Sequence, residues 1–166
     1  CIRDRYGRVA VCDFSDPLSH LGFAASDFML MPSSFEPCGL PQMIAPIYGA
    51  LPVAHDTGGI HDTTVDLDAD GDRGNGFLFK NFDSGGLFWA IGQAMNFYYL
   101  PKNIKNKQIR RIMKESAKTF THAHTARQYI ALYERMLKRP LIVDDAPNPV
   151  AGKTTFDQDP PDRLKT

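Results

Sequence analysis

One stretch of the chain, residues 31–42, combines a carboxylate, a thiol and a glycine between two apolar segments. Glu36 can accept hydrogen bonds from sugar hydroxyls. Cys38, Gly39 and Leu40 lead into a predicted helix with backbone N–H groups that the helix does not use, and such a helix start attracts phosphate. Gly39 has no Cβ, so a ligand can approach the backbone closely there. A carboxylate beside free amides suits a nucleotide-sugar, while the spacing alone equally allows Glu36 to be only a helix cap.

Apolar segments on either side predict the elements that hold this stretch in place. The run from Phe28 to Met31 is typical of a short buried strand, and the run from Met43 to Tyr48 is typical of a buried helix. Serine, proline and glycine between them indicate a turn, and Pro41 suits the first turn of a helix. In an open parallel sheet such a turn lies at the carboxyl ends of the strands, where ligands bind.

Three motifs together resemble bacterial glycogen synthases and plant starch synthases, which are retaining glucosyltransferases of the GT-B architecture. The motifs are Ser33-Ser-Phe-Glu-Pro-Cys-Gly-Leu40, Tyr48-Gly-Ala-Leu-Pro-Val53 and Thr57-Gly-Gly-Ile-His-Asp-Thr63. The resemblance runs in register from around Arg8 to around Leu137, and Phe-Glu-Pro-Cys-Gly-Leu is close to a signature of the group. It favours a binding role for Glu36 over a helix cap.

The resemblance implies an α/β fold: a Rossmann-like parallel sheet flanked by helices, forming part of the C-terminal domain of a GT-B glycosyltransferase. Residues 1–138 would be this nucleotide-sugar-binding domain without its first strands. Residues 139–166 are rich in proline and aspartate and predict a tail or linker. Family members have two Rossmann-like domains with a cleft between them, so we expect the chain to be a fragment that lacks the N-terminal domain.

The same resemblance implies roles for residues of the central stretch. Glu36 would be the residue of the catalytic centre that binds hydroxyls of the donor glucose. The amides of Cys38 and Gly39 would reach the same sugar, and the amide of Leu40 would meet the distal phosphate. Many relatives carry threonine where this chain has Pro41, which offers neither an amide nor a hydroxyl. A nucleophilic role for Cys38 is not favoured, because no histidine–aspartate pairing that would activate it is visible.

Two further segments are expected at the donor site. Phe14 matches an aromatic position that stacks on the nucleotide base in the family, with ordinary inward packing as the alternative. Thr57, Gly58 and Gly59 follow a second predicted strand, Pro52 to His55, and would form a wall of the site, since glycine lets a ligand approach the backbone.

By resemblance, the function is glucosyl transfer from a nucleotide-glucose to an α-1,4-glucan with retention of configuration. ADP-glucose is the expected donor, UDP-glucose is the alternative, and no metal or other cofactor is implied. Family members stabilise the departing diphosphate with an arginine and a lysine from an earlier part of the domain, and none of those positions is in this chain. We therefore expect the chain alone to be inactive. Two alternatives are a non-catalytic nucleotide-sugar-binding or regulatory module, and another GT-B transferase such as a sucrose or trehalose synthase, which the central motif disfavours.

Composition argues against several other classes of protein. Lysine plus arginine equals aspartate plus glutamate at 19 each, so no basic field indicates nucleic acid. No apolar run approaches membrane-spanning length and no signal peptide opens the chain. The three cysteines have no metal-binding spacing, and their odd number argues against a disulfide framework. We expect a cytoplasmic protein with no membrane or nucleic-acid partner.

The remaining segments predict one edge of the sheet and the helices around it. The acidic segment from Val65 to Asn75 lacks the terminal glutamate of a calcium-binding EF-hand loop and is interpreted as a solvated surface loop. Apolar residues within Gly86–Leu100, among them Trp89, are interpreted as core packing. The other predicted elements are strands at Arg8–Cys12 and Gly76–Phe79 and helices at Leu18–Ala25, Asn106–Ala117 and His122–Lys138.

Overall fold

Three parallel strands form the centre of the fold in this computed structural model, which describes residues 2–3, 10–11, 13 and 15–141. The strands are β3 (Phe28–Met31), β4 (Leu51–His55) and β5 (Phe77–Phe79), in the order β3-β4-β5. Phe28 lies opposite Leu51, and Val53 lies opposite Phe77. All five residues of β4 are buried, as expected for the central strand of a parallel sheet that is covered on both faces. The predicted parallel α/β sheet is confirmed.

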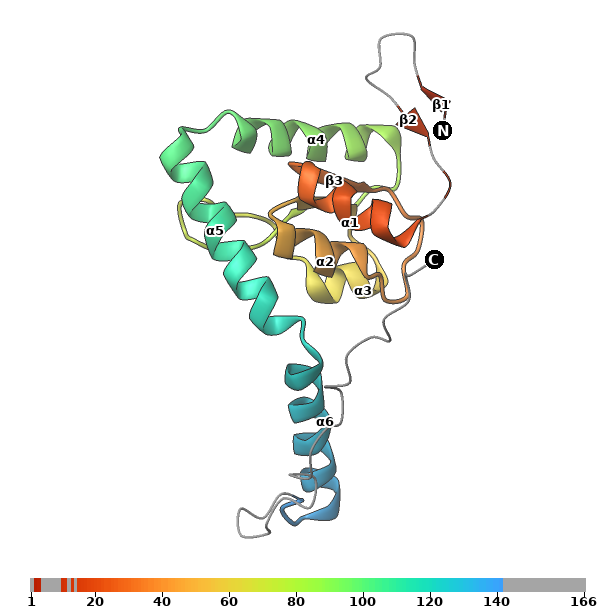
Figure 1. Cartoon of the computed structure of the whole chain (residues 1–166), viewed down its shortest axis with the longest axis vertical. Helices are drawn as coiled ribbons and strands as arrows, with labels where there is room; N and C mark the ends of the chain where they lie inside the picture. Colours follow the sequence, from red (N-terminus) through yellow and green to blue (C-terminus); the bar gives the residue numbers. More distant parts are fainter. Residues whose placement is uncertain (1, 4–9, 12, 14, 142–166) are drawn as a thin grey trace, which may run out of the picture. The chain divides into compact units, whose positions relative to one another are not determined.

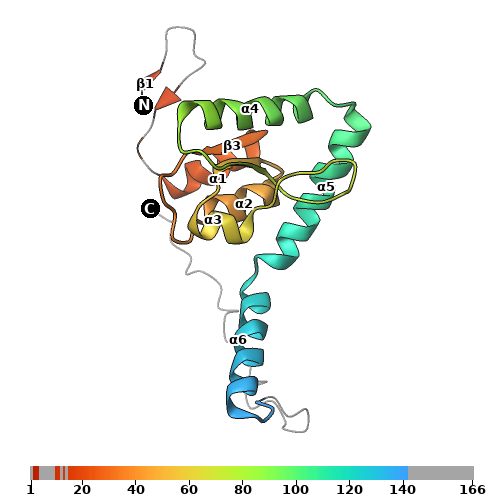
Figure 2. The same cartoon turned by 180° about the vertical axis from the view of Figure 1, so that it is seen from behind.

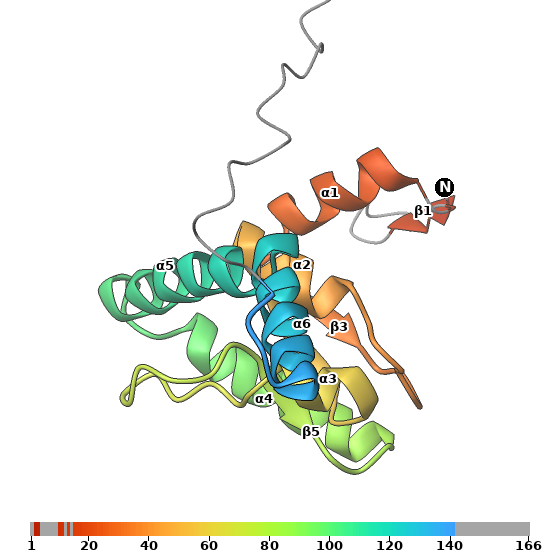
Figure 3. The same cartoon turned by 90° about the horizontal axis from the view of Figure 1, so that it is seen from below.

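Helices cover both faces of this sheet (Figures 1 and 2). On one face, α4 (Ser84–Tyr98) packs on β4 and β5. On the other, α2 (Pro41–Tyr48) packs on β3 and β4, with α1 (Asp16–Ala25) and α3 (Gly58–Thr63) beside it. The long helix α5 (Lys102–Thr119) packs along α2, as Figure 3 also shows. The sheet is therefore enclosed by helices, and the turns after β3 and β4 lie at one edge.

The hydrophobic core has one cluster of buried residues on the α4 side of the sheet and two on the opposite side. On the α4 side, Phe77 and Phe97 pack with their ring centroids 5.9 Å apart. Each fully buried phenylalanine contributes about 1.5–3 kcal/mol. The buried residues are Leu51, Val53, Phe77, Phe79, Ala90, Ala94, Phe97 and Ile112 on the first side and Phe23, Met31, Ala45, Ala50, Ala54 and Ile60 on the second.

The interpretation of the whole apolar stripe of α4 as core is wrong for part of its length. Ala90, Ala94 and Phe97 are buried, and their spacing of about one turn places them on the face toward the sheet. Trp89 is 55% exposed, and Met95 and Tyr98 of the same stripe are also exposed. A sheet of three short strands covers one narrow face of a 15-residue helix, so the large side chains beside that face remain in solvent.

The helix predictions after the sheet are confirmed with shifted boundaries. In α5 the residues Gln108, Ile112 and Ser116 are buried, and the lysines occupy the exposed face. The last helix, α6 (His122–Leu137), has no buried residue. The chain forms two units, Cys1–Thr125 and Ala126–Thr166, so most of α6 belongs to the second. Among the described residues, no helix is long and apolar enough to cross a membrane.

At the start of the chain, the structure describes only part of the predicted strand Arg8–Cys12. Ala10–Val11 forms strand β2, which pairs antiparallel with β1 (Ile2–Arg3) and not with the central sheet.

Candidate functional site

The central stretch forms the turn between β3 and α2, as the sequence predicts. Leu40 is the N-cap of α2, and its carbonyl accepts hydrogen bonds of 3.0 Å from the amides of both Met43 and Ile44. The amides of Cys38, Gly39 and Leu40 donate to no protein acceptor in the described part of the chain. They are thus available to a ligand at the positive end of the helix.

Glu36 does not cap α2, so the helix-cap alternative is wrong. The N-cap position belongs to Leu40, and no side chain caps the helix. Glu36 is half-buried, and its carboxylate has no hydrogen-bond partner among the described residues. Cys38 is a free, exposed cysteine. The turn therefore presents an unpaired carboxylate next to unpaired amides.

The turn after β4 lies directly against this stretch. The amide of Gly59 donates to the carbonyl of Glu36 over 2.8 Å. A Cβ at Gly58 would overlap the Glu36 carbonyl, and a Cβ at Gly59 would overlap the carbonyl of Cys38. Only glycine permits this approach. The structure thus brings together two segments that the sequence placed separately at the donor site.

The segment after β4 forms the short helix α3, Gly58–Thr63. Thr57 is the N-cap of α3, and the helix begins with Gly58 at a φ of +47°. Two successive glycines disfavour helix, so the contacts with the β3–α2 turn, and not local preference, account for this element.

Gln42 is a residue of this region that sequence analysis missed. Its side chain is completely buried. Its Nε2 donates to the carbonyl of Cys38 over 2.8 Å and to Oγ1 of Thr63 over 3.2 Å, and that hydroxyl donates to the carbonyl of Gly59 over 2.5 Å. Its Oε1 is buried and has no hydrogen-bond partner among the residues that the structure describes. A glutamine in a first helical turn carries no local signal of such a role.

Two histidines lie near the end of β4: His55 is its last residue, and His61 belongs to α3. Nδ1 of buried His55 lies 2.8 Å from the carbonyl oxygen of Ser33. Since a carbonyl can only accept, the ring carries a proton on Nδ1 and donates it to this oxygen. Nδ1 of His61 lies 2.6 Å from a carboxylate oxygen of Asp56, and this hydrogen bond together with the aspartate charge raises the pKa of His61. Within the described residues, no three side chains of histidine, cysteine, aspartate or glutamate are grouped as metal ligands.

The acidic loop after α3 is anchored more firmly than a freely solvated loop. Lys107 donates to a carboxylate oxygen of Asp72 over 2.7 Å, and buried Gln108 donates to the same carboxylate over 2.6 Å. The pKa of Asp72 is lowered, first by the hydrogen bond from Lys107 and then by that from Gln108. Arg111 reaches the carbonyl of Gly74 over 2.7 Å. The loop is on the surface, as predicted, but α5 holds it in place.

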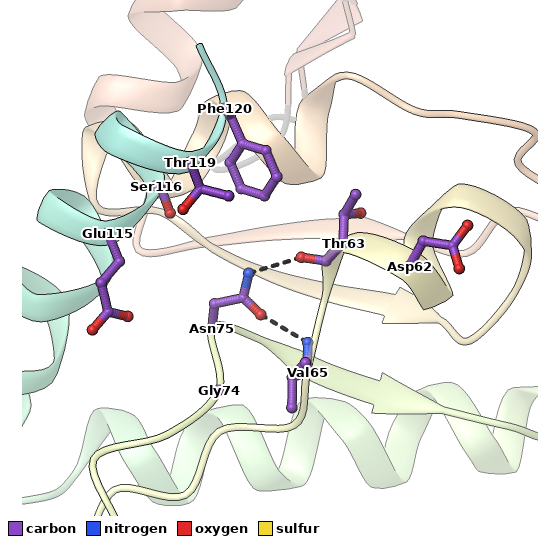
Figure 4. Close-up of a pocket in the computed structure, with 9 residues that line it drawn as sticks. All are labelled: Asp62, Thr63, Val65, Gly74, Asn75, Glu115, Ser116, Thr119 and Phe120. Carbon is purple, nitrogen blue, oxygen red and sulfur yellow. Dashed lines mark hydrogen bonds between the residues drawn. The ribbon is translucent and has the colours of Figure 1, made fainter. Parts of the chain in front are cut away.

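A cavity of about 310 Å³ lies between this loop and the end of α5 (Figure 4). Asn75 stands at its centre, accepting from the amide of Val65 and donating to the carbonyl of Thr63. The cavity contains none of the predicted donor-site residues. Its lining is Asp62, Thr63, Val65, Gly74, Asn75, Glu115, Ser116, Thr119 and Phe120.

Comparison with known proteins supports the family resemblance, although no family model matches the chain. A glycogen synthase of Bacillus licheniformis is 43% identical over 129 residues, which are 78% of this chain and 26% of that protein. Soluble starch synthase 3 of Solanum tuberosum is 37% identical over 79% of this chain and 11% of its own length. The chain is homologous to bacterial glycogen synthases and plant starch synthases. It spans about a quarter of the length of the bacterial relatives.

A solved structure of the glycogen and starch synthase family has the same fold. The catalytic domain of starch synthase IV from Arabidopsis thaliana, bound to ADP and acarbose, matches with a TM-score of 0.63 and 39% identity, over 76% of this chain and 26% of that one. The predicted family and fold are confirmed. The roles of Glu36, Cys38, Gly39, Leu40, Thr57, Gly58 and Gly59 remain predictions, and Phe14, the predicted base-stacking residue, lies outside the described residues.

Proposed function

We propose that this chain supplies part of the donor site of a glycogen or starch synthase, which transfers glucose from a nucleotide-glucose to an α-1,4-glucan with retention of configuration. The observation that carries the proposal is the row of unpaired amides from Cys38 to Leu40 beside the unpaired carboxylate of Glu36. The relative of known structure with 39% identity holds ADP and acarbose. The two ligands of this relative support a nucleotide and a glucan as the ligands of the proposed site. ADP-glucose is the expected donor.

Each group has a distinct task in this proposal. The amide of Leu40, at the start of α2, binds the distal phosphate through the partial positive charge of the helix. The amides of Cys38 and Gly39 and the carboxylate of Glu36 bind hydroxyls of the glucose. Such contacts position the reacting carbon and stabilise charge on the departing diphosphate, which are large contributions to catalysis of group transfer.

The segment around Gly58 and Gly59 adds a second side to the proposed donor site. Its backbone lies against Glu36 and Cys38, so it is placed to form a wall for the sugar. Phe14 is assigned to the nucleotide base by resemblance alone.

The two segments of the site carry no cationic side chain other than His61. Residues 32–42 and 56–63 contain no lysine or arginine. Two negative charges on a leaving diphosphate need more stabilisation than one helix start provides. We therefore expect the remaining cationic groups, and the acceptor site for the glucan, to come from parts of the relatives that this chain does not span. Glucan elongation by the 166-residue chain alone would contradict this expectation.

The shortage of cationic groups also favours a second candidate, a non-catalytic module that binds nucleotide-sugars. Both candidates predict nucleotide binding, and they differ in whether a longer protein containing this chain elongates glucan. A longer protein that binds ADP-glucose without transferring glucose would favour the module.

The test of the donor site is calorimetric titration of ADP and then UDP into the purified chain. We expect ADP to bind and the Leu40→Pro substitution, which removes the amide assigned to phosphate, to abolish binding. Glu36→Ala should leave ADP binding intact, because its carboxylate is assigned to the glucose, and should weaken ADP-glucose binding. ADP binding that survives Leu40→Pro in a folded variant would overturn the phosphate assignment.

A further inference from the structure

We propose that Gln42 is the positioning residue of the donor site, fixing the direction in which the amide of Gly39 points. This inference rests on the proposed function, since it concerns the same amides. Gln42 itself is fully buried. Its effect would be transmitted through the backbone of the β3–α2 turn.

The orientation of the Gln42 side chain is fixed by its two partners. Nε2 lies 2.8 Å from the carbonyl oxygen of Cys38, which can only accept a hydrogen bond. The opposite assignment of the amide would place two acceptors against each other. Nε2 therefore holds the Cys38 carbonyl toward the interior of the protein.

Because the peptide group is planar, this contact also determines the direction in which the N–H of Gly39 points. The carbonyl of Cys38 and the N–H of Gly39 belong to one trans peptide group, in which the two bonds point in opposite directions. Because Gln42 draws the carbonyl inward, the N–H of Gly39 is directed away from the interior. This amide has no protein acceptor among the described residues and is one of those assigned to the donor sugar.

A second contact ties this arrangement to the wall of the site. Nε2 of Gln42 also lies 3.2 Å from Oγ1 of Thr63, which donates to the carbonyl of Gly59 over 2.5 Å. The two segments are thus linked twice, through this chain of hydrogen bonds and through the direct contact between Gly59 and Glu36. A shift of Gln42 would move both segments.

The geometry around Gly39 indicates a positioning role in preference to simple packing. Gly39 has a φ of +75°, and a Cβ there would overlap Oε1 of Gln42. That oxygen is buried without a partner, which lowers stability relative to an apolar side chain of the same shape. A position selected only for packing would favour methionine or leucine. The hydrogen bond to Cys38 is the feature that an apolar residue cannot reproduce.

The chain contains a matched control for Gln42. Gln108 is also fully buried, and its Nε2 also donates twice, to the carbonyl of Ala69 and to Asp72, each over 2.6 Å. Its partners belong to the acidic loop and not to the donor-site segments. Gln42→Met and Gln108→Met therefore remove the same chemical groups from equally buried positions, and Gln108→Met also removes the oxygen that accepts from Nε of Arg111 over 2.9 Å. Only Gln42→Met alters the turn.

The experiment measures ADP affinity by calorimetry and the amide signals of Gly39 and Leu40 by NMR in the full chain. We expect Gln42→Met to weaken ADP binding about tenfold or more, since small misplacements of binding groups have large effects, and to shift the Gly39 amide signal. Gln108→Met should leave the affinity within about twofold and the Gly39 signal unchanged, because sites that share no partners act independently and the partners of Gln108 are Ala69, Asp72 and Arg111. Thr63→Val should give an intermediate loss of ADP affinity, and Thr63→Ser, which keeps the hydroxyl, should retain the wild-type affinity.

The two measurements separate this inference from the proposed function. If Gln42→Met has wild-type ADP affinity and an unshifted Gly39 signal, the positioning role of Gln42 is wrong, and the proposed donor site is still supported by the binding of ADP. If the wild-type chain binds no ADP, the proposed donor site fails in this chain, and the Gly39 signal still decides whether Gln42 sets the amide. Should Gln42→Met fail to fold, Thr63→Val provides the same comparison, and an unchanged Gly39 signal in that variant would count against the inference.

Discussion

The amide of Gly59 donates a 2.8 Å hydrogen bond to the carbonyl of Glu36, joining the turn after β4 to the turn after β3. Parallel strands place their carboxyl ends at the same edge of a sheet, and β3 and β4 are neighbours. Two segments separated by more than 20 residues in the sequence therefore form one surface. The closeness depends on Gly58 and Gly59, because a Cβ at either would overlap a carbonyl of the first turn.

Substitution of Gly59 by alanine is expected to destabilise the fold and weaken ADP binding together. The new Cβ would meet backbone atoms of Cys38, which cannot move aside as a flexible side chain can. Such overpacking costs about 1–3 kcal/mol. Urea denaturation followed by circular dichroism would measure the loss, and calorimetry would measure the affinity.

Gly92 in α4 is the control for this substitution, since nothing lies within 4 Å of a Cβ there. Gly92→Ala should stabilise the protein by about 0.5–1 kcal/mol through the preference of alanine for helix. Equal stability of Gly59→Ala and wild type would show that the two turns are not held in this contact.

The sequence predicted the framework of this surface because its signals are local. The apolar runs of β3 and β4 are short, rich in large or β-branched residues and bounded by turn residues, which is the pattern of buried parallel strands. The central motif between them is specific enough to indicate the family. The edge of the sheet that carries the site then follows from the rules of parallel sheets.

The features that sequence analysis missed depend on tertiary contacts. Helix α3 begins with two glycines, and only its packing against Glu36 and Cys38 makes a helix there understandable. The burial of Gln42 depends on Thr63, which is 21 residues away. Periodicity shows which face of a helix is apolar but not how much of that face the sheet covers. Trp89 therefore fits the apolar pattern of α4 although its side chain is exposed.

Replacement of Pro41 by threonine is expected to strengthen ADP binding. Pro41 is the first residue of α2 and has no N–H, so the helix start lacks one donor that another residue would supply. An additional hydrogen bond to a charged phosphate contributes about 1.5–3 kcal/mol, which corresponds to an affinity gain of about tenfold or more. Titration calorimetry with ADP would measure the gain.

Pro41→Ala separates the two groups that threonine introduces. It supplies the amide without the hydroxyl, so an equal gain in both variants assigns the effect to the backbone N–H. A Pro41→Thr variant that folds and binds ADP no better than wild type would argue against phosphate at the start of α2.

The contact between His61 and Asp56 is expected to make stability depend on pH. The pKa of His61 is raised from 6.5, mainly by its hydrogen bond to Asp56. Because the folded pKa lies above the unfolded value, the contact stabilises the fold fully below pH 6.5 and loses its effect as the pH rises through the raised pKa. NMR titration of the His61 ring should show a lower pKa in Asp56→Asn than in wild type.

Urea denaturation of wild type and His61→Gln at two pH values provides the stability measurement. The wild type should be the more stable of the two at pH values below 6.5, and the difference should shrink above the raised pKa. A difference that stays constant or grows with pH would contradict the sign of this linkage.

Arg111 is expected to be the main anchor of the acidic loop on α5. Its side chain is only 17% exposed and donates to the carbonyl of Gly74 over 2.7 Å, to Gln108 over 2.9 Å and to Glu115 over 2.7 Å. Removing hydrogen bonds to a charged, partly buried group costs about 1.5–3 kcal/mol. Arg111→Met keeps much of the aliphatic stem and should lower the free energy of unfolding by an amount in this range.

Hydrogen exchange would locate the effect of Arg111→Met within the chain. The amides of Leu67, Asp68 and Arg73 form backbone hydrogen bonds inside the loop and should exchange faster, because the loop opens more often once its anchor is lost. Arg110, one position earlier, is exposed, and Arg110→Met should leave both stability and loop exchange close to wild type. Since the loop packs on α5 and not on the β3–α2 turn, ADP affinity should be unchanged in both variants. Faster exchange of the Gly59 amide, which is hydrogen-bonded to the carbonyl of Glu36, in Arg111→Met would instead mean that the loop and the donor site open as one unit.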